Sequence, residues 1–157
     1  NCVEKNYRTI AAACLANGHV AIAKTPIEIN LAKQLNILLC DLGLKPDSII
    51  MDPTTGALGY GLEYTYSVME RLRLACLDGD GMTSMPMICT VGEEAWREKE
   101  AKFTEGLPPS WGDHLERSLL WEELTATTLL YAGADIVVIR HPKVVEVVKG
   151  TIDKLMR

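Results

Sequence analysis

The chain alternates short apolar runs with longer segments in which apolar residues recur at three- and four-residue steps. A short apolar run bounded by turn residues is typical of a buried strand, and the helical spacing indicates an amphipathic helix that covers it. Strands that are apolar on both faces and separated by helices form parallel sheets. The four predicted strands are His19–Ala23, Ser48–Met51, Met85–Cys89 and Asp135–Ile139.

A helical pattern follows each predicted strand, and a further helix is expected to open the chain at Glu4–Ala16. Asn17-Gly18, Gly43 and Asp78-Gly79 end the first three helices, because glycine readily adopts the left-handed conformation that stops a helix. The last helix is predicted to bury a stripe made of Val144, Val148, Ile152 and Leu155.

The third unit is less regular than the others. Its strongly charged run, Glu93–Glu105, continues the helical pattern and is followed by a turn-rich insert at 106–112. A second helix, about Leu115 to Ala132, comes next and is stopped by Gly133. The side chains expected to face inward on it are Leu115, Leu119, Leu120, Leu124 and Leu129.

The predicted fold is therefore α/β, with a leading helix and four parallel strand–helix units in one domain over residues 1–157. Four such units form either a small open sheet or half of an eight-stranded (β/α) barrel. The opening helix has no strand ahead of it, which we interpret as a missing amino-terminal part of a longer protein. This interpretation favours the half-barrel.

Composition limits the function classes. The 157 residues are 48% hydrophobic and 24% charged, as in ordinary globular domains. The net charge of -5 argues against a surface for nucleic acid or an anionic membrane, since both attract clustered Lys and Arg. No apolar run approaches the roughly 20 residues that cross a bilayer, and no leader is recognised, so a cytoplasmic location is expected.

The five cysteines are widely spaced and form no Cys-x-x-Cys pair. A zinc site or an iron–sulfur site built by this chain alone is therefore not expected. We interpret the cysteines as buried apolar thiols in a reducing compartment.

The segment from Asp52 to Gly61 is the strongest candidate for binding. It follows a predicted strand directly and contains Gly56, Gly59 and Gly61, although a strand-to-helix connection usually needs only about 2–6 residues. Ligands bind at the carboxyl ends of parallel strands, and glycine lets the backbone approach them closely. The candidate contacts here are Asp52, Thr54, Thr55, Gly56, Gly59, Tyr60 and Gly61.

Three weaker candidates also lie just past strand ends: Thr25, Thr90 and His141. Threonine in such a position often only caps the next helix, so both threonines have an equally good structural explanation. His141 lacks a neighbouring carboxylate or cysteine motif, so we expect it to touch a ligand rather than to catalyse. Arg140 beside it suits a phosphate or a carboxylate equally well.

The run Asp-Pro-Thr-Thr-Gly-Ala-Leu-Gly-Tyr-Gly-Leu-Glu-Tyr-Thr-Tyr-Ser-Val-Met-Glu-Arg, which starts at Asp52, closely resembles the small (delta-type) subunit of the corrinoid iron–sulfur protein. That protein belongs to the carbon monoxide dehydrogenase/acetyl-CoA synthase system. Three further stretches agree with the family in the same order: Ile29–Leu39, Trp121–Thr127 and Gly133–Pro142.

The resemblance implies a TIM barrel of roughly twice this length, of which the chain is the C-terminal half. It implies a large partner subunit that carries the iron–sulfur cluster, and a corrinoid (cobamide) held between the two subunits. The pair would carry a methyl group between a pterin- or folate-dependent methyltransferase and acetyl-CoA synthase. The candidate contacts would then bind corrinoid, with no catalytic residue and no metal ligand on this chain.

Two other functions remain open. One is a barrel enzyme of the pterin-dependent methyltransferase type, acting at the same strand ends. The other is a purely structural interaction module whose loops pack against a partner. The exposed strand edges of half a barrel also predict self-association of the isolated chain.

Overall fold

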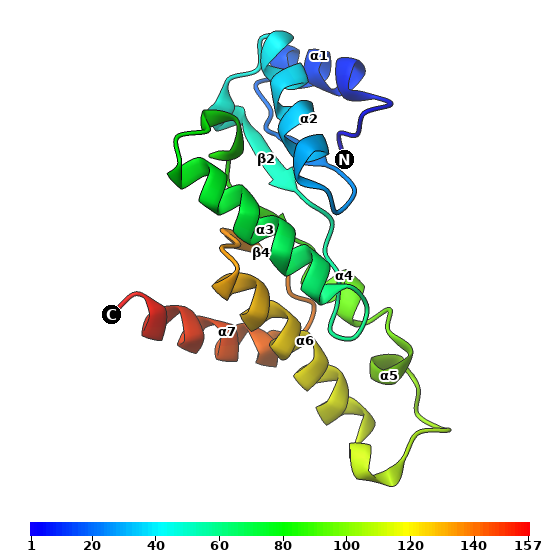
Figure 1. Ribbon diagram of the computed structural model, residues 1–157. Helices are drawn as coiled ribbons and strands as arrows, with labels where there is room; N and C mark the ends of the chain where they lie inside the picture. Colours follow the sequence, from blue (N-terminus) through cyan, green and yellow to red (C-terminus); the bar gives the residue numbers. More distant parts are fainter.

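The computed structural model describes all residues from 1 to 157 and has a mixed α/β fold of helices and short parallel strands (Figure 1). In chain order the elements are α1 (Tyr7–Asn17), β1 (Ala21–Lys24), α2 (Ile29–Asp41), η1 (Pro46–Ser48), β2 (Ile49–Asp52), α3 (Leu62–Leu77), η2 (Gly81–Thr83), β3 (Ile88–Cys89), α4 (Val91–Ala95), α5 (Lys99–Lys102), η3 (Pro109–Trp111), α6 (His114–Tyr131), β4 (Ile136–Val137) and α7 (Pro142–Leu155).

The four predicted strands are confirmed, although each is shorter than or shifted from its apolar run. β1 pairs in parallel with β2, with Ala21 opposite Ile49, and β3 pairs in parallel with β4. A parallel bridge between Met51 and Met87 joins β2 to the segment that leads into β3. The strands therefore lie side by side in chain order, and their carboxyl ends all reach the same edge.

The chain does have a strand-like segment ahead of its first helix, so the expectation of none was wrong. Cys2 forms a parallel bridge with Ala23 of β1. Its N–H donates to the Ile22 carbonyl at 2.9 Å, and its carbonyl accepts the Lys24 N–H at 2.7 Å. One paired residue is too short to show as an apolar run in the sequence. The outer edge of β1 is thus partly covered.

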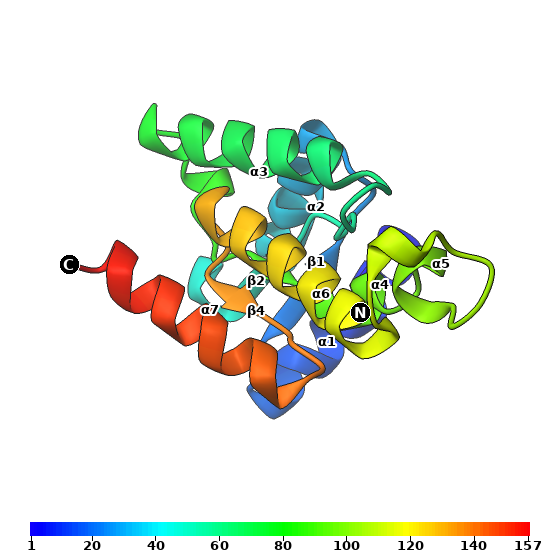
Figure 2. The ribbon, with the colours of Figure 1, turned by 90° about the horizontal axis from the view of Figure 1, so that it is seen from below.

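The helices pack against one another in chain order. α1 contacts α2, α2 contacts α3, α3 contacts α6, and α6 contacts α7. Figure 2 shows α6 lying between α3 and α7, with the strands beneath these helices. A continuous core of 25 buried residues lies between helices and strands, with Leu39, Ile49, Met51, Met69 and Leu72 at its centre. To this core α2 contributes Ala32, Leu35 and Leu39, and α3 contributes Leu62, Val68, Met69 and Leu72.

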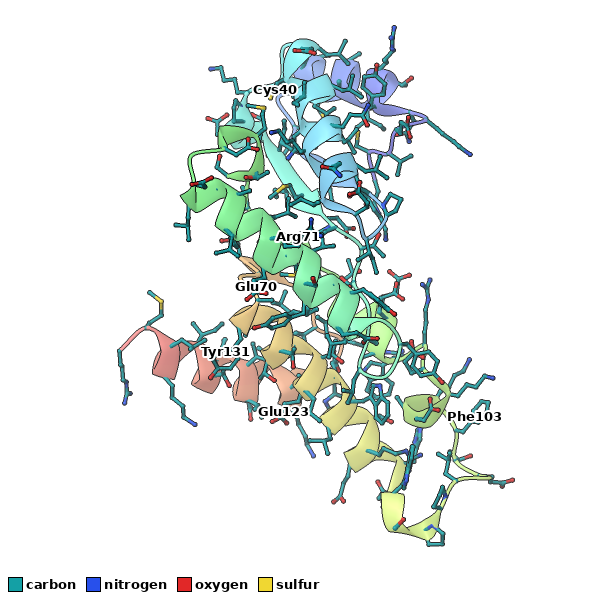
Figure 3. The ribbon with its side chains drawn as sticks, in the orientation of Figure 1. Cys40, Glu70, Arg71, Phe103, Glu123 and Tyr131 are labelled. Carbon is teal, nitrogen blue, oxygen red and sulfur yellow. The ribbon has the colours of Figure 1, made fainter.

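The charged run after β3 is not one helix. It forms two short helices, α4 and α5, separated by residues 96–98. Trp96 lies at this break because its indole N–H donates to the Glu122 carboxylate on α6 at 2.7 Å. A tertiary contact thus interrupts a segment whose local propensity favours continuous helix. α5 and η3, with the loop between them, form an arm that projects from one end of the molecule, where Figure 3 shows Phe103.

The inward face of α6 differs from the prediction. Leu129 is fully buried, but Leu115, Leu120 and Leu124 are 44%, 52% and 42% exposed. The buried face instead carries polar side chains together with Ala126 and Leu129. These polar residues are Arg117, Ser118, Glu122 and Thr125.

This polar face satisfies backbone groups of the arm. The Arg117 guanidinium donates to the carbonyls of Glu100, Phe103 and Gly112, at 2.5, 2.6 and 3.2 Å. Ser118 donates to the Ala101 carbonyl at 2.5 Å. A carbonyl that loses water without gaining a donor is costly, which explains why α6 turns polar residues rather than leucines toward the arm.

Only the first half of the predicted α7 stripe is buried. Val144 and Val148 are 1% and 4% exposed, whereas Ile152 and Leu155 are 40% and 47% exposed. No helix of the structure combines the length and the apolarity that a membrane span requires.

The uncovered apolar surface near β4 predicts self-association. Ile136 and Val138 are 38% and 44% exposed beside an unpaired strand edge, and Leu77 on α3 is 83% exposed. Such an edge and apolar surface favour association. We expect the isolated chain to sediment as dimers or larger species at micromolar concentration. A compact monomer that melts cooperatively would contradict this expectation.

Candidate functional site

The predicted contacts begin where the parallel strands end. Thr25 follows β1, Asp52 ends β2 and Thr90 follows β3. The Thr25 N–H donates to the Asp52 carbonyl at 3.0 Å, so the ends of β1 and β2 are tied together. The structure thus brings these three residues to one edge of the sheet, as the sequence predicted.

Asp52 is a buried carboxylate whose hydrogen bonds and nearby charge offset only part of the cost of its burial. Its side chain is 1% exposed, and Oδ1 accepts the Thr54 N–H at 3.0 Å. Oδ2 has no hydrogen-bond partner and lies 3.7 Å from the Lys24 ammonium. Burial raises the pKa of Asp52, and the Lys24 charge and the Thr54 hydrogen bond offset part of that rise.

Thr54 adopts a strained backbone conformation. Its φ of 63° lies in the left-handed region, which a β-branched residue rarely adopts. Two hydrogen bonds hold it there: its N–H donates to Asp52, and its Oγ1 donates to the Thr25 carbonyl at 2.5 Å. Strain of this kind costs about 1–3 kcal/mol and gathers at functional sites.

The second threonine of the run, Thr55, connects β2 to β3. Its Oγ1 accepts the Thr90 N–H at 2.8 Å. Cys89 lies beside it, and burial raises the pKa of the Cys89 thiol to about 12, with Asp52 adding to the effect. The thiol is therefore protonated near neutral pH and is a poor nucleophile.

The glycines of the 52–61 loop are explained by the backbone. A Cβ on Gly56 would lie 2.3 Å from the Gly61 carbonyl oxygen, so the loop closes on itself at this point. Gly59 and Gly61 have φ of 77° and 92°. The close approach at Gly56 is thus to the chain's own backbone, which gives this glycine a structural role whether or not it binds a ligand.

The same loop is fastened to α6 and to the arm. The Leu58 N–H donates to Thr125 Oγ1 at 3.2 Å, and the Trp121 indole N–H donates to the Leu58 carbonyl at 3.1 Å. The Tyr60 hydroxyl donates to the Glu100 carboxylate, with its oxygen atoms at 3.0 and 3.1 Å. Tyr60 remains 47% exposed, so its ring is accessible to a ligand or a partner.

His141 belongs to a separate group of side chains. Its ring stacks near Trp96, with centroids 6.4 Å apart and an interplanar angle of 14°. The Arg140 guanidinium lies 4.7 Å from the centroid of Trp96. No hydrogen bond joins His141 to Thr25, Asp52 or the glycine loop.

Sequence reasoning missed the residue that organises this second group. This residue is Glu122, which is fully buried. One of its carboxylate oxygens accepts a hydrogen bond from the Trp96 indole N–H, and the other accepts one from the Arg140 backbone N–H at 2.5 Å. A signal was present, because Ser118, Glu122, Thr125 and Leu129 recur at helical spacing on one face of α6. The prediction placed the leucines of that helix on the buried face instead.

A cavity of about 380 Å³ opens at the ends of the Cys2 segment, β1 and β2. Thr25, Thr54 and Lys24 line it on the strand side, and α2 closes it with apolar side chains: Leu31, Leu35 and Leu38. Three buried polar atoms without a partner belong to residues at the strand ends, and one of these residues, Thr25, lines the cavity. The three atoms are Thr25 Oγ1, Asp52 Oδ2 and Thr90 Oγ1.

Comparison with known proteins identifies the family. Residues 2–150 match the family model described as CO dehydrogenase/acetyl-CoA synthase delta subunit. The chain belongs to this family. The resemblance proposed from the run at Asp52 is thereby confirmed.

Several archaeal relatives carry the name acetyl-CoA decarbonylase/synthase complex subunit delta. The chain is 42% identical to that of Methanopyrus kandleri over 92% of its length, and 38% identical to that of Archaeoglobus fulgidus over 98%. The chain is 39% identical to the Methanosarcina mazei relative over 94% of the chain's length. The aligned part makes up only 35%, 34% and 36% of these relatives, so the chain spans about a third of their length.

The raised pKa of Asp52 predicts a pH-dependent stability. The folded state binds this proton more tightly than the unfolded chain, so the carboxyl destabilises the fold increasingly as pH rises through the folded pKa. Asp52→Asn cannot ionise. We expect the unfolding free energy of the variant, relative to wild type, to increase between pH 4 and pH 7 in urea titrations. A difference that does not change with pH would show that Asp52 has an ordinary pKa.

The glycine loop predicts a graded effect of alanine. Gly56→Ala should lower the melting temperature most, because its Cβ meets backbone at 2.3 Å. A Cβ on Gly59 would meet only the Trp121 side chain, at 3.8 Å. Gly59→Ala should therefore lower the unfolding free energy only by the cost of a non-glycine residue in the left-handed region, about 1–2 kcal/mol. Gly81→Ala, with open space around it, is the control. If calorimetry gives Gly56→Ala the same melting temperature as this control, the close contact between Gly56 and the Gly61 carbonyl is refuted.

Proposed function

We propose that the chain is part of a corrinoid-supporting subunit of an acetyl-CoA decarbonylase/synthase complex. Membership of the delta-subunit family carries this proposal. In it, the subunit works with a large partner subunit that carries an iron–sulfur cluster. Together they move a methyl group between a methyltransferase and acetyl-CoA synthase.

We also propose that the chain forms the C-terminal half of a TIM barrel. The strands lie in chain order, all parallel, and the helices contact one another in the same order. Both features are required in such a barrel. The unpaired edge of β4 would then be covered by the rest of the barrel.

The residues at the strand ends are compatible with a corrinoid. When bound, the corrinoid supplies the methyl-transfer chemistry, and the protein supplies binding, orientation and shielding. A whole cobamide is larger than the cavity of about 380 Å³ beside Thr25, so residues at the strand ends outside the cavity would also have to hold it. There the exposed Tyr60 ring offers an apolar contact, while the Asp52–Thr54 hydrogen bond and Thr65 hold the loop in place.

Thr65 connects the loop to the following helix. Its Oγ1 accepts the Gly56 N–H at 2.7 Å and donates to the Thr54 carbonyl at 3.0 Å. Thr65 is fully buried, so this double contact is shielded from water. A loop held in this way presents Tyr60 without a large entropy cost on binding.

Loss of the Tyr60 ring should weaken corrinoid retention without unfolding the protein. We expect Tyr60→Ala, assembled with the large subunit, to release cobamide about fivefold more readily, since one aromatic contact contributes about 1 kcal/mol. Tyr131→Ala is the matched control, because Tyr131 is 64% exposed at the end of α6, away from the loop. Retention is read from the visible spectrum after gel filtration, with melting temperatures measured alongside.

The same experiment separates the other functions. Turnover of a methyl-pterin by this protein without its partner would favour the methyltransferase-like enzyme. A spectrum of added cobamide that does not change in the assembled pair would favour the structural interaction module and refute corrinoid binding. Equal retention in both tyrosine variants would remove Tyr60 from the site.

A further inference from the structure

We propose that Arg140, His141 and Trp96 form a binding site for a phosphate group at the carboxyl ends of β3 and β4. The site goes beyond the corrinoid proposal and does not depend on it. Only the last comparison below, between two corrinoids, rests on the proposed function.

The Arg140 side chain is positioned by an aromatic ring but has no acidic partner. Its guanidinium lies over the Trp96 ring, 4.7 Å from the centroid, and it forms no ion pair or side-chain hydrogen bond in the chain. Its donor groups are therefore available to a ligand. A planar guanidinium fork matches the oxygens of a phosphate, and stacking on an aromatic ring limits its motion.

Glu122 fixes both parts of this arrangement. It is fully buried, and its two oxygens accept the Trp96 indole N–H and the Arg140 backbone N–H. Gly92 lies against the same point, where a Cβ would be 2.5 Å from the Arg140 nitrogen. A buried carboxylate used only to orient two groups indicates a preorganised site.

His141 adds a second donor. Its Nδ1 accepts the Lys143 N–H at 3.3 Å, so the proton of the neutral ring is assigned to Nε2. His141 also caps the amino end of α7, a helix of 14 residues, where partial positive charge favours an anion. The helix end adds to the site but does not define it.

The space beside Arg140, next to His141 in the chain, is sufficient for a phosphate. A cavity of about 310 Å³ is lined by Gly92, Trp96, Val138 and Arg140, together with Glu93 and Arg97. Arg97 is paired with both Glu93, at 2.7 Å, and Glu94, at 2.9 Å. The two carboxylates more than compensate its charge, so Arg140 is the only cation in the cavity lining without an acidic partner.

Titration of the intact protein with inorganic phosphate tests the site by calorimetry. Wild type should bind saturably. Arg140→Gln should weaken binding at least about tenfold, as expected for a charge-assisted hydrogen bond, and Arg71→Gln, on α3 and outside the cavity lining, should leave it unchanged. Both side chains are exposed, so melting temperatures should match wild type. Equal binding in Arg140→Gln, or no saturable binding in wild type, would overturn the proposal.

Cobalamin and cobinamide distinguish the two sources of phosphate. They share the corrin ring, but cobinamide lacks the phosphodiester of the nucleotide loop. If the assembled wild-type pair prefers cobalamin and Arg140→Gln abolishes that preference, the site binds the cobamide phosphodiester. If the preference persists while inorganic phosphate still requires Arg140, the site serves a separate phosphate-bearing molecule. Retention of cobinamide reports on corrinoid binding independently of Arg140.

Discussion

The buried carboxylate of Glu122 is the interaction on which the arrangement of the strand ends depends most directly. A carboxylate removed from water is costly unless its oxygens accept hydrogen bonds. Here one oxygen accepts an indole N–H from the break between α4 and α5, and the other accepts a backbone N–H after β4. Three separate parts of the chain are thereby fixed at one point. Removing the carboxylate would leave two partly buried donors without this partner.

The rest of the buried face of α6 works in the same way. Thr125 and Trp121 hold the glycine loop through Leu58, and Arg117 and Ser118 hold the arm. Each of these contacts satisfies a backbone group of the glycine loop or of the arm. An unsatisfied buried group costs about 1–3 kcal/mol. A leucine face on α6 could not have met this requirement, which is why the helix presents polar residues to the interior.

The ends of β1, β2 and β3 differ from this face, because they keep polar groups without partners. There the fold keeps a strained Thr54, a carboxylate whose pKa is raised by burial, and unpartnered oxygens on Thr25, Thr90 and Asp52. None of these features improves stability. Proteins tolerate such costs mainly where a ligand or partner uses the groups, which is consistent with placing the proposed corrinoid contact at these strand ends.

The sequence by itself determined the order of the elements, the positions of the four strands and the stops at Gly18, Gly43 and Gly79. These follow from local chemistry: apolar periodicity and backbone freedom are properties of neighbouring residues. It also located Thr25, Asp52 and Thr90 correctly at one edge, because parallel strands carry their carboxyl ends to the same side. The tertiary structure alone decided which face of α6 is buried, where the charged run breaks at Trp96, and that His141 joins Arg140 rather than the glycine loop. Those outcomes depend on hydrogen bonds between residues far apart in the chain, such as Glu122 with Trp96 and Thr125 with Leu58. Local pattern carries no information about which distant backbone group needs a partner.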